Sequence, residues 1–328
     1  MTLRTGSEAQ IGEPVLSGVV QGRDVVRQDT QASTRRGPFG IGLVVLATTA
    51  WSSGGVFINI VVAGSSITPL GLAFWRVFCT FMILLLGIAL IRPALLRVAR
   101  RDLVWLAGLG ALAMGTFQAL WVASVLTNGL SVASVIQCNA PIIVTLLAWL
   151  FWRESLTWQK WAALTLAGVG TVLIAQPTSA GNVQITGMGL TIALGSALAY
   201  SAITLFTKKL TGDYNQWTIL VYGFGFAALA LLPFQFGRPL PVVVSGQAWL
   251  AFAALLLITT ISGYGLYASA LKHLPASVAS IVAMSEVPLS AIWGYLLLHE
   301  RLDAGQIIGA IVVISGVALL SLRVRTRA

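Results

Sequence analysis

Residues 103–152 read LVWLAGLGALAMGTFQALWVASVLTNGLSVASVIQCNAPIIVTLLAWLFW, a run of 50 residues without a charged side chain. Two further uncharged runs cover residues 161–207 and 37–75. A membrane-spanning helix needs about 20 predominantly apolar residues. The longest runs therefore have room for more than one span, and turn residues such as Thr127-Asn128-Gly129 mark the divisions between spans.

The composition of the whole chain agrees with these runs. Of its 328 residues, 57% are hydrophobic and only 9% are charged, whereas a soluble domain is typically about 25% charged. So few charges exclude a soluble globule of this length, and so many apolar residues exclude intrinsic disorder. Two cysteines exclude a disulfide scaffold.

Turn and charge signals divide the chain into ten apolar segments. Their continuous apolar character argues against a β-barrel, whose strands alternate between two environments. We therefore predict an all-α integral membrane protein with ten transmembrane helices. The predicted spans are 39–62, 69–91, 103–126, 131–152, 157–175, 186–207, 216–234, 247–271, 276–298 and 304–322.

The basic residues predict the orientation of these spans. If the N-terminus is inside, seventeen of the twenty Lys and Arg residues lie in inside loops and tails, Arg238 and Arg301 lie outside, and Arg76 lies within a span. This asymmetry predicts a multi-pass protein of the plasma (inner) membrane with both termini cytoplasmic. The basic excess is thus a topology signal that points to an anionic lipid bilayer as partner, and nucleic acid is not expected to bind.

An internal repeat covers most of the chain. The tetrapeptide 131–134 recurs at 277–280, an offset of 146, and Asn139-Ala140-Pro141 matches Glu286-Val287-Pro288 at 147. Each half holds five predicted helices, and an odd number makes the second half enter the membrane from the opposite side. Such inverted repeats are typical of secondary transporters, which bind substrate near the membrane midplane. We predict a disordered tail at 1–36, repeats at 37–175 and 186–322, and a basic tail at 323–328.

The two stretches 131–174 and 277–320 resemble the paired EamA repeats of the drug/metabolite transporter superfamily. Each has a mid-helix proline, an apolar run, a Glu-x-Leu triplet and a glycine-rich helix. The resemblance extends over about residues 38–322 and implies a ten-helix exporter with a central cavity between the halves. The chain departs from the family at Arg153, where a small residue is usual before Glu154.

Two charged side chains lie at membrane depth in the predicted spans. Glu286 lies near the middle of its span, and Arg76 lies about two turns from the outer end of another. Intramembrane charges are costly and usually face a cavity or a partner. Glu286 is a candidate to contact a cationic group of the substrate or to carry a coupling proton, and the alternative is a neutral acid hydrogen-bonded for helix packing. Arg76 is a candidate substrate ligand, or it snorkels to the outer interface.

Neutral polar and aromatic side chains complete the candidate substrate site. They either line the cavity or serve helix packing, and the sequence leaves both roles open. Pro141 and Pro288 are expected to kink their helices. Besides Glu286 and Arg76, the candidates are Gln118, Gln137, Asn139, Trp51, Trp121, Tyr200 and Tyr267.

Glu154 and Glu300 follow the fourth and ninth predicted helices. We interpret them as conformational locks that bind backbone amides at the start of a neighbouring helix. Cys79 and Cys138 have no ligand cluster near them, so we expect neither a metal nor a cofactor.

The predicted function is export of small metabolites, with amino acids as the favoured substrates and proton coupling as an open possibility. One acid and one base in the spans suit a zwitterion. Efflux of drugs or organic cations is the alternative. An intramembrane enzyme or a channel is disfavoured, because the spans contain no acid dyad, mid-span histidine or rings of pore charges.

Overall fold

The computed structural model describes residues 37–128, 136–137, 139–175, 186–236, 245–298 and 304–326. The described residues form helices joined by turns and short loops, with no β-strand among them. Seven of the described helices are long and apolar enough to cross a membrane, and Ala140–Trp152 and Ala304–Leu320 are shorter apolar helices. The all-α prediction is therefore confirmed for this part of the chain. The predicted tail at 1–36, Cys138 and Glu300 lie outside the described residues.

The helices of the first half begin with Gly37–Ala63, whose second part is α2 (Gly54–Ala63). Helix α3 begins where the sequence predicts, because Thr68 Oγ1 accepts a hydrogen bond from the Gly71 amide and Pro69 occupies the first turn. The elements that follow are α3 (Pro69–Ile91), η1 (Pro93–Leu96), η2 (Arg100–Asp102), α4 (Leu103–Ala107), η3 (Gly108–Gly115), α5 (Thr116–Asn128), α7 (Ala140–Trp152) and α8 (Trp158–Ala175).

The second half starts with α9, capped by the side chain of Thr186. Its elements are α9 (Gly187–Leu210), α10 (Gln216–Leu231), η4 (Leu232–Gln235), α11 (Gly246–Ala254), η5 (Leu255–Ser262), α12 (Gly263–Ala270), α13 (Ala276–Ala283), α14 (Glu286–Leu298) and α15 (Ala304–Thr326). Helix α15 thus extends into the predicted basic tail at 323–328.

The segments predicted as single helices at 131–152 and 276–298 are each divided by a turn. Proline has no N–H and its ring clashes with the carbonyl four residues earlier, so the helix cannot continue unchanged before Pro141 and Pro288. Tighter i to i−3 bonds form there, from the Asn139 amide to the Ile136 carbonyl and from the Met284 amide to the Ile281 carbonyl. Each proline lies in the first turns of the helix that follows.

Two other helices share a second irregularity, a π-helical stretch. Segments η3 and η5 each have eight residues, and they begin at Gly108 and Leu255, which are 147 residues apart. π-Helical stretches are rare, and those that occur often lie at functional sites. The backbone irregularities of the two halves therefore recur at the offset of the sequence repeat.

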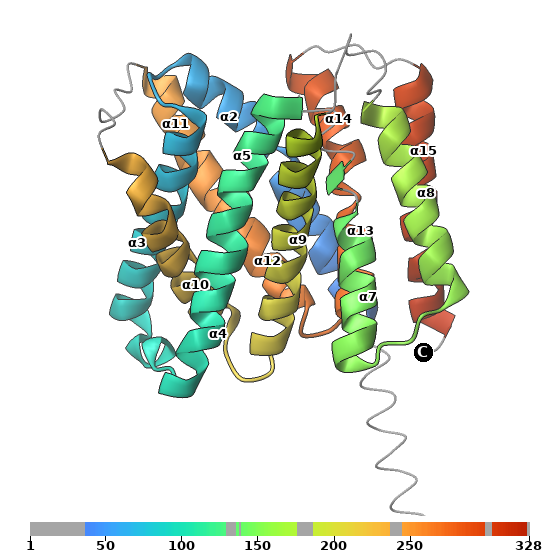
Figure 1. The fold of residues 1–328 in the computed structure, drawn as a ribbon, viewed down its shortest axis with the longest axis horizontal. Coiled ribbons are helices and arrows are strands. Elements are labelled where there is room, and N and C mark those ends of the chain that lie inside the picture. Colours follow the sequence, from blue (N-terminus) through green and yellow to red (C-terminus); the bar gives the residue numbers. More distant parts are fainter. Residues whose placement is uncertain are drawn as a thin grey trace, which may run out of the picture.

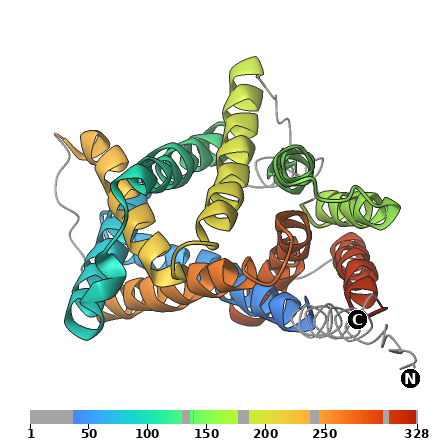
Figure 2. The same cartoon turned by 90° about the horizontal axis from the view of Figure 1, so that it is seen from below.

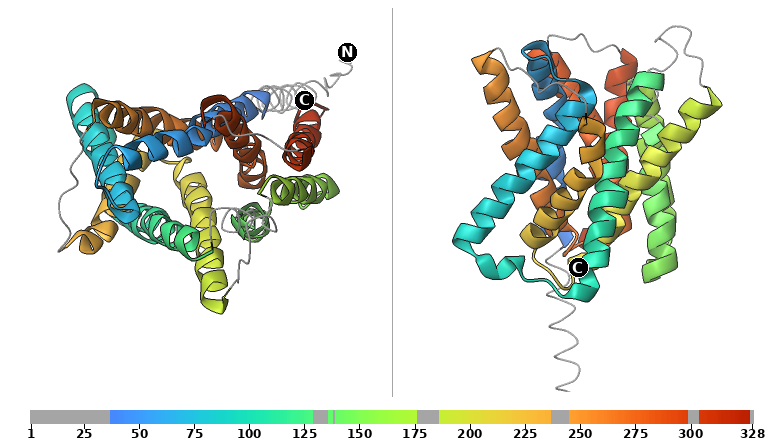
Figure 3. Two further views of the ribbon diagram at one scale, coloured as in Figure 1. Left: turned by 90° about the horizontal axis from the view of Figure 1, so that it is seen from above. Right: turned by 60° about the vertical axis from the view of Figure 1, so that its left-hand side comes forward.

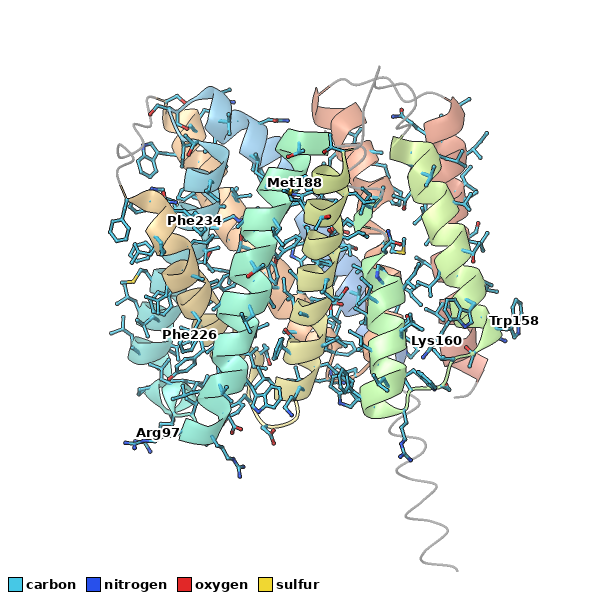
Figure 4. All side chains as sticks on the ribbon, in the orientation of Figure 1. Arg97, Trp158, Lys160, Met188, Phe226 and Phe234 are labelled. Carbon is cyan, nitrogen blue, oxygen red and sulfur yellow. The ribbon has the colours of Figure 1, made fainter. Side chains whose placement is uncertain are left out.

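The helices stand side by side, with loops at both ends (Figure 1). Helices α8 and α15 lie together at one end of the elongated cross-section, while α3 and α10 lie at the other (Figures 2 and 3). The connection between α7 and α8, the end of α9 and the end of α15 lie at the lower end in Figure 1. Lys160 and Arg97 also lie in the lower half (Figure 4).

Buried side chains form two main clusters. One packs residues of helix Gly37–Ala63 against α7, α8, α12 and α13, and the other packs α3 and η3 against α9 and α10. Both clusters combine elements of the two halves. The halves are therefore joined through shared cores.

Glycines allow α8 and α15 to approach backbone to backbone. A Cβ atom on Gly170 would lie 2.5 Å from the Gly309 carbonyl oxygen, and one on Gly309 would lie 2.6 Å from the Gly170 carbonyl oxygen. Small residues at helix contacts are a common source of packing energy in membranes. In contrast, a Cβ on Gly168, one half-turn away, would meet nothing within 4 Å.

We predict that Gly170→Ala destabilises the protein and that Gly168→Ala does not. The added methyl at 170 forces two backbones apart, which costs about 1–3 kcal/mol by overpacking. The methyl at 168 should stabilise the helix by up to about 1 kcal/mol. Thermal unfolding in detergent micelles measures both variants. Equal midpoints for the two variants would contradict the close packing of α8 on α15.

Candidate functional site

An aromatic cluster lies where the two halves meet. The ring of Trp51, from the first helix, contacts the rings of Tyr264 and Tyr267 on α12, with centroids 5.2 Å apart in both pairs. Tyr264 also meets Phe224 of α10 edge to face at 5.5 Å. A Cβ on Gly263 would lie 2.4 Å from Trp51 Nε1, so only glycine leaves room for this indole.

A second aromatic group mirrors the first. Phe117 of α5 contacts Tyr200 of α9 at 5.2 Å and stacks on Trp121 at 6.1 Å. Phe117 and Tyr264 are 147 residues apart. The contact of α5 with α9 in one half thus resembles the contact of α12 with the first helix in the other half.

Glu286 is the first residue of α14, directly after the turn in its helix. It interacts electrostatically with Tyr200 and Tyr264, which come from two different helices. Its side chain is partly buried and makes no hydrogen bond or ion pair with a described residue. A carboxylate in this position has free capacity to bind a cation or a proton.

Arg76 lies on α3 and is a second charged neighbour of Tyr264. The two side chains interact electrostatically, so Tyr264 is the neighbour that Arg76 and Glu286 share. The Nε atom of Arg76 is buried and has no hydrogen-bond partner among the described residues. A buried donor without a partner is unfavourable and is rare unless a ligand or water satisfies it.

The other predicted residues fall into three places. Tyr267 is buried with its hydroxyl hydrogen-bonded to Thr204 at 3.1 Å, next to Trp51. Gln137 Oε1 accepts from Ser196 at 3.3 Å, while its Nε2 is buried without a described partner. Asn139 donates to the Ile136 carbonyl and lines a separate cavity of about 420 Å³ between α7 and α8.

The structure therefore brings together Trp51, Tyr200, Tyr267, Glu286 and Arg76 around Tyr264. Trp121 lies beyond Phe117, and the buried Gln118 is on the same helix. Asn139, the repeat mate of Glu286, does not lie in this group but at the cavity beside α8.

Sequence reasoning missed Tyr264 and Gly263. Tyr264 is one helical turn before Tyr267, which places both on one face of α12. That spacing was available in the sequence as a signal. The requirement for glycine at 263 depends on where the Trp51 indole lies, which no local pattern indicates.

Glu154 forms a clamp at the lower end of the helices. The amides of Ala276 and Ser277, at the start of α13, donate to its two carboxylate oxygens at 2.8 and 3.3 Å, and the Ser277 hydroxyl donates as well. Lys160 Nζ lies 3.5 Å from the same carboxylate. The predicted binding of backbone amides at a neighbouring helix start by Glu154 is confirmed, and its role as a conformational lock stays a prediction.

The unusual residue before this clamp has a structural cost. Arg153 has φ 52° and ψ 34°, the left-handed conformation that ends α7. Glycine adopts this conformation without the clash that a Cβ causes. This explains why a small residue suits the position, and why arginine there is a strained substitute.

We predict that Glu154→Ala exposes the start of α13. Hydrogen bonds to a charged group contribute about 1.5–3 kcal/mol each, so the amides of Ala276 and Ser277 should exchange about 10- to 100-fold faster with deuterium. Hydrogen–deuterium exchange of peptides covering 276–283 measures this. Asp213→Ala, which removes an exposed carboxylate near the same end, is the control. Unchanged exchange in Glu154→Ala would contradict the clamp.

Comparison with known proteins identifies the fold. A family model for the EamA-like transporter family matches residues 38–176 and 187–322. A crystal structure with 16% sequence identity superposes with a TM-score of 0.72 and covers 88% of this chain and 98% of its own.

The alignments with named relatives extend over most of the chain. YicL, an uncharacterized inner membrane transporter of Salmonella typhimurium, is 25% identical over 90% of this chain and 98% of its own. A probable terminal-alkyne amino-acid exporter of Streptantibioticus cattleyicolor is 24% identical over 85% and 92%. An S-adenosylmethionine uptake transporter of Rickettsia felis is 24% identical over 84% and 90%. With both repeats matched by the family model, this chain is a multi-pass membrane protein that belongs to the EamA-like transporter family.

Proposed function

We propose that this chain is a secondary transporter of the inner membrane that exports small metabolites, with amino acids as its main substrates. Alternating access would proceed through a central cavity between two inverted five-helix repeats. Membership of the EamA-like transporter family supports the general function. The substrate class is supported by one relative named as an amino-acid exporter and another named for S-adenosylmethionine.

Paired irregularities support the inverted repeat. The π-helical segments η3 and η5 begin 147 residues apart, and both proline-linked turns occur in matching helices. Polar contacts at these turns match as well. Ser196 of α9 contacts Gln137 beside one turn, and Thr48 of the first helix contacts Ser285 in the other. A pseudo-twofold relation between halves of five spans places them in opposite orientations, as in many secondary transporters.

The observation that carries the substrate proposal is that Tyr264 interacts electrostatically with both Arg76 and Glu286. An amino acid is a zwitterion with an apolar or polar side chain. Its carboxylate would pair with Arg76, and its ammonium group would pair with Glu286. Trp51 and Tyr267 lie beside Tyr264 and would contact the side chain of the substrate.

The clamp supports alternating access. Glu154 belongs to the first half and binds the start of α13 in the second half, at the end that the basic loops predict to be cytoplasmic. Lys208 Nζ donates to the carbonyls of Leu271 and Leu274 at the same end, at 2.6 and 2.7 Å. These bonds would hold the cytoplasmic side closed and would have to break when the cavity opens inward.

Efflux of organic cations or drugs is a second candidate function. It is favoured by Glu286, which has no ion-pair partner among the described residues and has aromatic neighbours. Carboxylates with aromatic rings are suited to bind cations. This function would not require Arg76, and that difference separates the two candidates.

The test is transport by purified protein in liposomes, with a panel of amino acids and organic cations, with and without a pH gradient. We expect saturable transport of amino acids, and Arg76→Gln should reduce it by about 10- to 100-fold, which corresponds to one lost charge-assisted hydrogen bond. Glu286→Gln should reduce transport and remove any dependence on the pH gradient. Asp213→Asn, at an exposed position, is the control.

One outcome separates the two candidate functions, and another tests the role of Glu286. Transport of cations that is unaffected by Arg76→Gln would replace amino-acid export with cation efflux. An unchanged rate and pH profile in Glu286→Gln would exclude both the ligand role and the proton role of Glu286. Variants that lose transport are first compared with the wild type by thermal unfolding, so that loss of folding is separated from loss of binding.

A further inference from the structure

An apolar groove runs along the outer face of the helix bundle between α3 and α10. Its volume is about 380 Å³, and its walls are formed by Phe78, Phe81 and Leu85 of α3 and by Phe226 and Leu229 of α10. Leu229 is 62% exposed, so the groove is open toward the surrounding lipid. Figure 4 labels Phe226 on this side of the molecule.

The shape of the groove depends on one glycine and a row of aromatic rings. A Cβ on Gly225 would lie 2.9 Å from the Phe81 ring, so glycine allows this ring to pack closely against α10. Phe74 and Phe78 stack at 5.7 Å along the same wall. Stacked aromatic pairs stabilise their own arrangement by about 0.5–1.5 kcal/mol, which helps to keep the shape of this wall of the groove.

The lower end of the groove is fixed by hydrogen bonds to η1. Thr218 Oγ1 donates to the Leu95 carbonyl at 2.8 Å, and Tyr222 Oη donates to the Leu96 carbonyl at 2.7 Å. Leu96 itself lines the groove. The chain that carries the neighbouring basic residues is therefore held against α10.

Arginines flank this lower end. Arg92 and Arg97 lie on either side of η1, Arg100 follows, and all three are exposed and form no ion pair with a described carboxylate. Arg101 lies 3.7 Å from Asp102. Figure 4 places Arg97 below Phe226 on the same side of the protein. The apolar groove thus ends beside three arginines that form no ion pair with a described carboxylate.

The length of the groove fits one leaflet of a bilayer. Phe74 and Leu85 are eleven residues apart on α3, which corresponds to about 16 Å of helix. Half of the hydrocarbon core is about 15 Å thick. Leu96 of η1 also lines the groove, so a lipid chain in it would have its headgroup near the arginines on either side of η1.

We propose that this groove is a binding site for an anionic phospholipid of the cytoplasmic leaflet. One acyl chain lies between α3 and α10, and the phosphate is bound by Arg92, Arg97 and Arg100. Anionic lipids are attracted to juxtamembrane basic clusters on this side of the membrane. A second copy of the chain is a poorer occupant, because pairing this face with itself would bring two sets of arginines to the same end.

The experiment uses the full-length protein in liposomes that contain phosphatidylglycerol with a photoreactive diazirine on one acyl chain. After illumination, mass spectrometry of the peptides locates the crosslinks. We expect crosslinks on residues 74–85 and 221–232. The triple variant Arg92→Gln, Arg97→Gln and Arg100→Gln should reduce these crosslinks by at least about fivefold. This factor corresponds to the loss of one arginine contact with an anionic surface.

Matched controls distinguish a site from general contact with the bilayer. The triple variant Arg323→Gln, Arg325→Gln and Arg327→Gln removes the same charge elsewhere and should leave the crosslinks unchanged. Leu229→Trp fills the groove and should reduce the crosslinks, whereas Leu250→Trp, at another exposed position on α11, should not.

Three results would overturn the proposal. The first is equal crosslinking with a phosphatidylcholine probe, which would indicate a non-specific lipid shell. The second is equal loss in the two arginine variants. The third is crosslinking of α3 to a second copy of the protein in place of lipid, which would identify the groove as an interface between protomers.

Discussion

A membrane interior supplies no water, so every backbone N–H and C=O in it must be bonded within the protein. This constraint explains where the helices of this chain depart from regular geometry. The turns before Pro141 and Pro288 leave carbonyls without their usual helical donors. Side chains from neighbouring helices reach these turns: Ser201 donates to the Ala140 carbonyl at 3.1 Å, and Thr48 bonds Ser285 at 3.0 Å. Neighbouring helices of the bundle thus supply polar contacts at both turns.

The same irregularities recur in both halves, but the charges do not. The residue 147 positions after Arg76 is Gly223, and the repeat mate of Glu286 is Asn139. Backbone geometry that suits a membrane is thus shared, while each half contributes one charge of opposite sign next to Tyr264. Under the substrate proposal, this pair of unlike charges would bind a small molecule that carries both a positive and a negative group.

The local parts of this structure could be predicted from the sequence, and the parts that depend on packing could not. The bounds of α3 follow from Thr68, Pro69 and the charges after Ile91, which are all adjacent in the chain. The clamp at Glu154 followed from its place after an apolar helix. The site around Tyr264, the room for Trp51 beside Gly263 and the groove on α3 depend on contacts between helices far apart in sequence, so no local pattern indicates them.

Helix α13 connects the clamp to the candidate site. Its first two amides bind Glu154, all eight of its residues are buried, and the turn at its end is followed directly by Glu286. Eight helical residues span about 12 Å and move as a unit, because packed side chains do not deform continuously. Under the alternating-access proposal, release of Glu154 would therefore shift the turn before Glu286. Occupancy of the site by a charged substrate and closure of the clamp would then be coupled through one short helix, without any need for a change in the rest of the second half.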